Sequence, residues 1–557
     1  MNKRPFNRPP FNRPRIALLW LILLFICACS GSGAFVAPRA VPDDRLPVAD
    51  PDYRAINIPK DLIEKQFFDQ LKEAFNLPRQ VRRLSGHRRE AANLNAFDEP
   101  VNSSWYTRRH SSRRMSIEEL VNGPNSGEKG PDTNGAWTIT KVKNEGVTPG
   151  FNVVTESGVG YVIKFEPPGF SELASGAEVI GTKFFHAAGF NVPENYIVFF
   201  RPEILRIGEG LTFTDKRGRE RLFNAEDLAE LMKGVEARPD GRIRVAASKL
   251  IPAKKFLGPF SYKSTRKDDP NDFIRHEHRR ELRGLRVMAA WLNHYDTKDN
   301  NTLDVLTHQD FVKHYLIDFG STMGSQGNEP MPPQIGYENA FDPHQVFINS
   351  VTLGLYVRPW EKHGEVIYPA IGFFSAENFH PQKYKFIFPN PAFEMMTTRD
   401  GFWGAKLVMA FRDADIEAIV AEGRYTDPAA AAYLVEVLKK RRDIIGRYWF
   451  WRANPLDRPV LTTGDGGQSR LSTTDLAVES GLAETGQRRY RYRINGGAWN
   501  ESGQPEAVLP GDLLPNAFEQ VEVAFSVKDA IGGEWMEPFS VFLGPDPEGW
   551  QLIGVRR

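Results

Sequence analysis

The sequence predicts an α+β chain of several domains, with a mixed core in two parts and an all-β sandwich-like domain at its C-terminal end. Its 557 residues are about three times the common domain length. Between about 130 and 260, short β-like runs surround one long helix, and helical spacing dominates from 261 to about 456. From 461 to 557 the pattern changes to alternation, which is typical of half-buried strands.

Composition excludes several classes of protein. Hydrophobic residues make up 41% of the chain and aromatic residues 12%, so it is not wholly disordered. Two cysteines cannot build a disulfide framework or a cysteine-based zinc site. The near balance of 71 basic and 70 acidic residues argues against wholesale nucleic-acid binding.

Residues 1–29 predict a lipoprotein signal peptide. Five basic residues and no acidic one lie in 1–28, and the apolar run 16–26 follows the basic start. The run is short for a spanning helix, which needs roughly 20 apolar residues. Ile26-Cys27-Ala28-Cys29 resembles a bacterial lipobox, which makes Cys29 the lipidated residue. An uncleaved N-terminal anchor is the alternative, and either one places the folded part in the cell envelope, periplasmic or on the outer surface.

A tether and a basic extension are predicted next. Residues 30–59 are rich in Pro, Gly and Ala, as in a tether, and the extension 60–129 opens with a helix over 60–77. Arginines gather between 79 and 114, where they could contact anionic lipid headgroups or form a solvated arm around the next domain. Ser116-Ile117-Glu118-Glu119 predicts a capped short helix.

The region 130–260 is predicted to be a small β-rich lobe. Strands are predicted at 137–141, 151–155, 161–165, 197–200 and 243–251. One helix runs from about 171 to 188 and closes at Gly189. Its residues at helical spacing should face a core: Leu173, Ala177, Ile180, Phe184 and Ala187.

The region 261–456 is predicted to be mainly helical. The helix 281–292 has one apolar face, and Arg279, Arg283 and Arg286 fall on another face. Asp427-Pro428 predicts the start of a helix that reaches about Trp451. The aromatic run at the end of this helix, 448–451, should pack in the core or against the next domain. That domain has strands predicted at 490–494, 521–525 and 539–543.

The stretch from His294 to Leu303 carries the most chemical information. Two strands are predicted from there on, at 302–306 and 311–317. An antiparallel hairpin of these strands would bring Asn301 and Asp318 side by side, with Asp296 in the loop just before. Two oxygen ligands beside a free carboxylate suit a Mg²⁺ site next to a proton acceptor. Asn300 is the alternative ligand to Asn301.

These residues resemble the catalytic motifs of the protein-kinase-like superfamily. His294, Asp296 and Asn301 match H-R-D-L-x-x-x-N, and Asp318-Phe319-Gly320 matches D-F-G. The resemblance implies that Asp296 is catalytic, that Lys298 contacts a phosphate, and that Asn301 and Asp318 hold Mg²⁺. His294 is expected to be a structural hydrogen-bonding residue.

A second part of the resemblance lies upstream. Tyr161-Val162-Ile163-Lys164 ends a strand as the kinase V-A-I-K does, and Glu178 lies on the following helix. The resemblance implies that Lys164 holds the α/β-phosphates of the nucleotide and that Glu178 holds Lys164. Glu172 is a competing partner for Lys164.

Several departures point to atypical branches of the superfamily. The segment 145–150 replaces the glycine-rich loop, and only Gly146 and Gly150 remain as candidate nucleotide contacts. Tyr295 stands where kinases have Arg, and no Ala-Pro-Glu follows Asp318. The chain resembles spore-coat and secretory-pathway kinases, toxin-type Ser/Thr kinases and phosphatidylinositol 4-kinases. The stretch 276–304 is also similar to bacterial proteins that suggest no substrate.

The resemblance therefore implies an α+β fold with a two-lobed protein-kinase-like core, lobes 130–260 and 261–456, and a C-terminal all-β sandwich-like domain, 461–557. The expected function is an exported, lipid-anchored phosphotransferase that uses ATP or another nucleotide with Mg²⁺. The acceptor would be a hydroxyl of a protein, lipid or glycan, and no nucleic acid is expected as a partner. A catalytically inactive scaffold lipoprotein with a kinase fold is the alternative. An unrelated α+β envelope protein would be indicated if Lys164 and Asp318 lay far apart.

Overall fold

A computed structural model describes residues 34–56, 77, 89–126, 130–142, 150–214, 218–340, 342–362, 366–463, 468–510, 520–547 and 549–557. The predicted signal peptide with Cys29, nearly all of the predicted helix over 60–77, and Gly146 lie outside these residues. Among the described residues, no helix is both long enough and apolar enough to cross a bilayer.

A six-stranded sheet forms the first lobe, in the order β4-β8-β3-β2-β1-β5. Its strands are β1 (Trp137–Val142), β2 (Gly150–Thr155), β3 (Gly160–Phe165), β4 (Asn195–Phe200), β5 (Leu205–Ile207) and β8 (Ile243–Lys249). A small hairpin, β6 (Thr212–Thr214) with β7 (Glu220–Leu222), and α7 (Ala225–Met232) lie between β5 and β8. The strands predicted in this region are all present, with bounds within two residues.

Helix α6 (Leu173–Ala188) connects the sheet to the second lobe. It contacts β3, β4 and β8 on one side and α5 (Ile117–Asn122) and α12 (Asp413–Ala421) on another. The predicted core face is confirmed, because all five of its residues are at most 2% exposed. The helix ends where Gly189 adopts φ 118°, a left-handed conformation that glycine tolerates.

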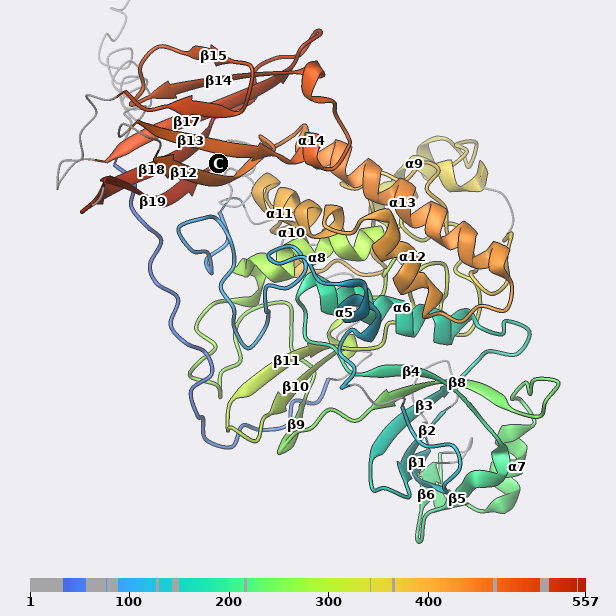
Figure 1. Ribbon diagram of the computed structural model, residues 1–557. Coiled ribbons are helices and arrows are strands. Elements are labelled where there is room, and N and C mark those ends of the chain that lie inside the picture. The colour runs from blue at the N-terminus through green and yellow to red at the C-terminus, as the bar shows by residue number, and fades with distance from the viewer. Residues whose placement is uncertain are drawn as a thin grey trace, which may run out of the picture.

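The second lobe is mainly helical (Figure 1). Its helices are α8 (Arg280–Trp291), α9 (Pro343–Val351), α10 (Pro391–Glu394), α11 (Thr398–Met409), α12 and α13 (Pro428–Phe450). A three-stranded antiparallel sheet lies beside them: β9 (Lys255–Gly258), β10 (Thr302–Leu306) and β11 (Val312–Leu316), in the order β11-β10-β9. The predicted start of α13 is confirmed, since Asp427 caps it through the Ala429 N–H and proline occupies its first turn.

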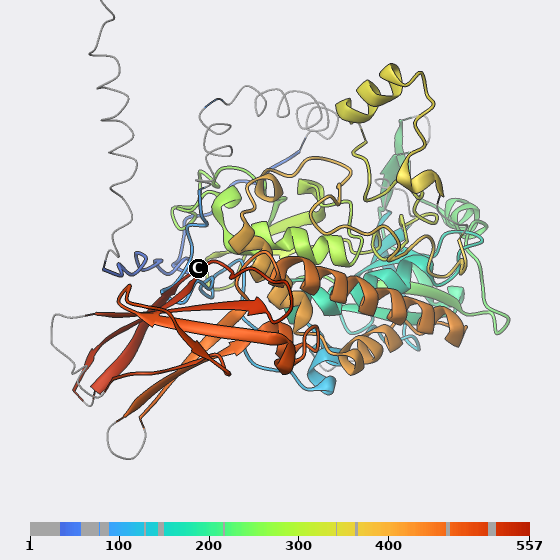
Figure 2. The same ribbon diagram turned by 90° about the horizontal axis from the view of Figure 1, so that it is seen from above.

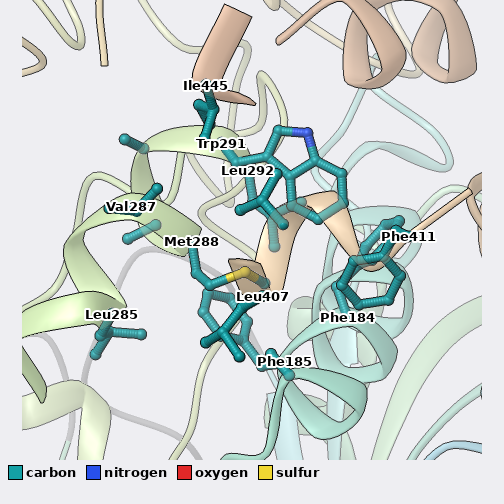
Figure 3. Close-up of a cluster of buried hydrophobic side chains, with 14 of the residues drawn as sticks. Phe184, Phe185, Leu285, Val287, Met288, Trp291, Leu292, Leu407, Phe411 and Ile445 are labelled. Carbon is teal, nitrogen blue, oxygen red and sulfur yellow. The ribbon is translucent and has the colours of Figure 1, made fainter. Parts of the chain in front are cut away.

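The main hydrophobic core lies where α6 meets the helices of the second lobe. Figure 3 shows Phe184 and Phe185 of α6 beside Met288 and Trp291 of α8 and Phe411, which follows α11. Phe184 packs edge-on against Trp291, with ring centroids 4.9 Å apart. Burial of such large rings on both elements fixes α6 firmly against the helical lobe.

Two facing sheets form the C-terminal domain, which Figure 2 shows to one side of the helical lobe. One sheet contains β12 (Leu456–Thr463), β13 (Ser469–Asp475) and β16 (Glu506–Val508), and the other β14 (Arg488–Ile494), β15 (Asn500–Ser502), β17 (Val521–Asp529), β18 (Phe539–Asp546) and β19 (Gly549–Arg556). A short helix, α14 (Leu476–Glu479), follows β13. The aromatic run at the end of α13 packs as predicted, because Trp449 and Phe450 are buried and the Trp451 indole donates to Asp529 at 2.8 Å.

The described part of the N-terminal region wraps around these domains. Phe35 stacks on Phe542 of the β domain, with ring centroids 4.7 Å apart, and the Arg54 N–H donates to the Leu257 carbonyl. The Arg109 guanidinium donates to the carbonyl of His186, in the last turn of α6, and to that of Phe190, just beyond it. Arg114 pairs with Asp415. These contacts favour the arm over the lipid-contact alternative for these arginines.

Candidate active site

The ammonium group of Lys164 lies between two carboxylates. Its Nζ is 2.8 Å from Glu178 Oε2 and 2.8 Å from Asp318 Oδ1. Burial disfavours the charged lysine, but the carboxylates of Asp318 and Glu178 outweigh burial and raise the pKa of Lys164. A strand of the first lobe, a helix and the end of a second-lobe strand therefore meet at one cation. Lys164 and Asp318 are 154 positions apart in the chain.

A buried network holds Glu178 in place. Its side chain is 1% exposed, and the Asn195 amide donates to Glu178 Oε1 at 3.1 Å. The same amide donates to Thr182 Oγ1 at 2.6 Å, and the Ser248 hydroxyl donates to Asn195 Oδ1. The carboxylate therefore faces Lys164 in one fixed orientation.

Glu172, the competing partner, lies elsewhere. Its carboxylate accepts from the Thr426 N–H at 2.8 Å and lies 3.7 Å from Arg244 Nη1. Glu172 therefore joins the start of α6 to the second lobe, and Glu178 is the partner of Lys164.

The start of α6 is anchored by Glu166 and Arg244. Glu166 accepts from the N–H groups of Ala174 and Ser175, which belong to the first turn and have no partner within the helix. Arg244 pairs with Glu166 at 3.3 Å and donates to the carbonyl groups of residues 423 and 424. Burial raises the pKa of Glu166, against the effect of Arg244. This anchor fixes the helix that carries Glu178.

Asp318 follows β11, where the predicted hairpin forms. Strands β10 and β11 pair with Thr302 opposite Leu316, and the Ile317 N–H donates to the Asn301 carbonyl at 3.0 Å. Asn301 and the residue before Asp318 are therefore hydrogen-bonded neighbours at the base of the hairpin. Asp318 adopts φ 64°, a left-handed conformation that aspartate tolerates better than most residues.

Phe319 and Gly320, which follow Asp318, lie close against α6. Phe319 is fully buried and stacks on Phe185, with ring centroids 5.0 Å apart. A Cβ at Gly181 would lie 3.0 Å from the Phe319 side chain, and one at Gly320 would lie 3.2 Å from Glu178 Oε2. Both glycines therefore allow this segment to approach the helix closely.

One carboxylate oxygen of Asp296 accepts hydrogen bonds, and the other has no partner in the part of the chain that the structure describes. Its Oδ2 accepts from Lys298 Nζ at 2.9 Å and from the Asn301 amide at 3.1 Å. The same amide donates to the Asp296 carbonyl at 2.7 Å. Asp296 Oδ1 is buried and has no hydrogen-bond partner among the described residues. The carboxylate is thus oriented, with one acceptor atom left for another group.

The remaining loop residues have structural contacts. Asn301 rather than Asn300 faces Asp296, as the hydrogen bonds above require. His294 is buried beside Phe185 and Phe319, and its Nδ1 lies 3.3 Å from the Ser321 carbonyl. Burial lowers the pKa of His294, as expected for a structural histidine. The Tyr295 carbonyl accepts from the Ile387 N–H at 3.2 Å.

The site offers oxygen donors that suit a hard divalent cation. Among the described residues, no group of three or more His, Cys, Asp or Glu side chains could hold a metal. Mg²⁺ needs fewer protein ligands, because it keeps several waters and binds substrate phosphates as well. The side-chain amide oxygen of Asn301 and the carboxylate of Asp318 fit that requirement. The Asp318 side chain is 46% exposed.

Of the two predicted glycine contacts, only Gly150 is described. It opens β2 opposite Lys164, and a Cβ at this position would lie 2.2 Å from the Ile163 carbonyl oxygen. Gly150 is therefore required by the close approach of β3. No contact with a nucleotide follows from its position.

Sequence reasoning missed the residues that support the site. Asn195, Glu166 and Arg244 lie in or beside strands whose patterns indicate only burial. Glu166 lies two residues after Lys164 and several residues before α6, so the signal available was an acidic residue close enough in sequence to reach the first turn of that helix.

Comparisons with known proteins found similarity to solved structures of kinases. No protein-family model and no curated protein matches the chain. A proinflammatory kinase of Helicobacter pylori, CtkA, is 12% identical, with a TM-score of 0.31, over 57% of this chain and 97% of that one. The Golgi casein kinase with Mn and ADP bound is 11% identical, with a TM-score of 0.29, over 60% of this chain and 75% of that one. The described chain itself has a sheet lobe and a helical lobe connected by α6, with a β domain added.

Proposed function

We propose that this protein is a phosphotransferase of the cell envelope that moves the γ-phosphate of a nucleotide to a hydroxyl group. The observation that carries the proposal is the contact of Lys164 with both Glu178 and Asp318. Here one carboxylate, Glu178, fixes the lysine, and the other, Asp318, is half-exposed. The lysine could therefore bind the phosphates of a nucleotide while Asp318 binds its metal.

Each residue has a distinct part in the proposed reaction. Lys164, oriented by Glu178, would bind the phosphates of ATP or another nucleotide, and Asn301 and Asp318 would hold Mg²⁺. The cation, when bound, supplies positive charge that stabilises the phosphates. The free Oδ1 of Asp296 would accept the proton of the acceptor hydroxyl as that oxygen bonds to the γ-phosphorus and the nucleoside diphosphate leaves.

Lys298 would lie close to the transferred group. It pairs with the Oδ2 of Asp296 at 2.9 Å and is about one third exposed. An ammonium group at this position can contact the charged phosphate while it keeps the carboxylate oriented.

The proposed location depends on the N-terminal 29 residues. Their basic start, apolar run and lipobox-like end support export and acylation of Cys29. The enzyme would then act at a membrane surface, where acceptor hydroxyls of proteins, lipids or glycans are available. Mass spectrometry of the mature N-terminus tests this part, since an intact Met1 in the envelope fraction would contradict it.

The proposed activity is tested by nucleotide turnover with Mg²⁺. We expect Asp318→Asn to lower turnover of the purified full chain by roughly 100-fold or more, because a metal ligand is lost at the reacting phosphate. Asp310→Asn is the matched control, because Asp310 lies on the β10–β11 turn and its ion pair with Lys254 is exposed. Equal turnover in wild type and Asp318→Asn would refute the assignment.

One observation favours a second candidate function, a catalytically inactive scaffold with the same fold. The segment 145–150 lacks the glycine spacing that covers phosphates in active kinases. A scaffold would bind no nucleotide, so the two candidates differ in a direct binding measurement.

A further inference from the structure

A cavity of about 290 Å³ lies next to the residues that precede the 294–301 loop. Its walls include Asn293, Tyr337, Phe379, His380, Lys383 and Arg441. Lys164, Glu178, Asp296 and Asp318 are not among its lining residues, so this cavity is distinct from the proposed phosphotransfer site. Its volume is near the lower end of ligand pockets, roughly 300 Å³.

Arg441 of α13 is the central polar group of this cavity. The residue is 3% exposed, and its guanidinium donates to the Ser375 carbonyl at 3.0 Å and to the Ala290 carbonyl at 2.6 Å. It also lies over the rings of Phe379 and Phe374, at 3.9 and 4.7 Å from their centroids. Its Nε is buried and has no hydrogen-bond partner in the described part of the chain.

The absence of a carboxylate sets Arg441 apart within the described residues. The other buried arginines there each pair with an acidic side chain: Arg244, Arg279, Arg280, Arg283 and Arg488. Burial lowers the pKa of Arg441 to about 10, so the group stays charged at neutral pH. A buried charge without a counter-ion is costly, which makes an anion in the cavity favourable.

The charged residues that line the cavity, Arg441 and Lys383, are both positive. Lys383 is exposed at its rim, and His380 lies beside it. Glu377 lies outside the lining, although its backbone carbonyl accepts from the Tyr337 hydroxyl at 3.2 Å. Burial raises the pKa of Tyr337, and the Glu377 carboxylate also raises it. Two positive groups therefore lie at a cavity whose walls include several aromatic rings.

From this arrangement we infer a second binding site, for a small molecule that joins an oxyanion to an apolar or aromatic body. The oxyanion, a carboxylate or a phosphate, would accept from Arg441, whose planar fork suits both groups. The apolar body would contact the rings of Tyr337 and Phe379.

Ligand binding at this site would affect the position of the neighbouring loop 294–301. Tyr384, another wall residue, donates from its hydroxyl to Asn293 Oδ1 at 2.8 Å, and Asn293 adopts φ 53° just before His294. Arg441 holds the carbonyl of Ala290 near the end of α8. A bound anion would thus contact the residues that set where the 294–301 loop begins.

Isothermal titration of the purified full chain with benzoate, phenyl phosphate and benzamide tests the site. We expect millimolar or tighter binding of at least one of the two anions, and at least tenfold weaker binding of neutral benzamide. The stronger anion identifies the ligand as a carboxylate or a phosphate ester. Equal affinity for benzamide, or no binding of either anion, would overturn the inference.

Substitutions locate the binding within the molecule. Lys383→Gln should weaken anion binding about threefold and Arg441→Gln at least tenfold, whereas Lys440→Gln, at an exposed ion pair on the same helix, should leave it unchanged. Unchanged affinity in a folded Arg441→Gln would contradict the site. The benzamide comparison uses the wild-type chain and so does not depend on that variant folding. Neither test uses turnover, so the failure of this inference is distinguishable from the failure of the proposed function.

Discussion

Asp296 and Asp318 are two aspartates of one site with different surroundings. Asp318 makes an ion pair with Lys164 and is half-exposed, whereas Asp296 is held through Oδ2 and its Oδ1 has no hydrogen-bond partner among the residues that the structure describes. The first arrangement suits a ligand of a metal and its phosphates, and the second suits a proton acceptor. Their chemical roles should therefore separate on substitution.

Asp296→Asn should separate chemistry from nucleotide binding. We expect phosphoryl transfer to fall by roughly 100- to 10,000-fold, because the amide cannot accept the proton. Nucleotide affinity should change by less than about threefold, since Lys164 and Asp318 are untouched. A titration of Mg-ATP beside the turnover assay measures both, with Asp310→Asn as the control. An equal loss of affinity and of turnover would contradict the separate roles.

Segments far apart in sequence are joined by buried ion pairs between elements. Arg280 of α8 and Arg399 of α11 both pair with Asp98 of the N-terminal arm. Burial opposes ionisation of Asp98, but these two arginines outweigh it and lower the pKa to about 2. Because the folded pKa lies below the unfolded value of 3.8, the ionised carboxylate stabilises the fold.

The stabilisation by Asp98 should depend on pH with a defined sign. It is fully present above about pH 4 and is lost as the pH falls through 2. Asp98→Asn should therefore cost about 2 kcal/mol at pH 7 and much less near pH 2. Denaturant unfolding of both proteins at several pH values measures this difference. A cost that stays constant down to pH 2 would contradict the account.

Element positions and part of the site could be predicted from the sequence, for physical reasons. Helical spacing predicted the buried face of α6. Antiparallel pairing of the two strands predicted that Asn301 and Asp318 lie at the same end of the hairpin. The partners of charged residues could not be predicted in this way. Arg280 and Arg283 lie on the non-apolar face of α8, yet both are buried, because carboxylates from distant segments such as Asp400 approach them.

The whole molecule is joined by contacts between the helical lobe and the β domain. Lys406 of α11 pairs with Asp457 of β12 at 2.7 Å and with Glu99 of the N-terminal arm. Burial opposes the charge of Lys406, but Asp457 and Glu99 outweigh it and raise its pKa. Three parts of the chain thus meet at one half-buried cation, so the β domain is a fixed part of the structure.

Lys406→Met should weaken this junction. Removing the cation leaves Glu99 and Asp457 without their shared partner, so we expect a loss of about 3 kcal/mol. Urea unfolding followed by tryptophan fluorescence measures the loss. Lys440→Met is the matched control, because its pair with Glu436 is exposed on both sides and should contribute less than about 1 kcal/mol. Equal effects of the two substitutions would show that the junction is not fixed by Lys406.

Lys164 and Asp318 together are proposed to bind a nucleotide with its metal. The most direct test is the thermal midpoint of the full chain with millimolar ATP, measured with and without Mg²⁺. We predict a rise of a few degrees that requires Mg²⁺ and is lost in Lys164→Met, since ligand at about 100 times its dissociation constant stabilises by about 2.7 kcal/mol. No rise with ATP and Mg²⁺, or an equal rise in Lys164→Met, would contradict the claim.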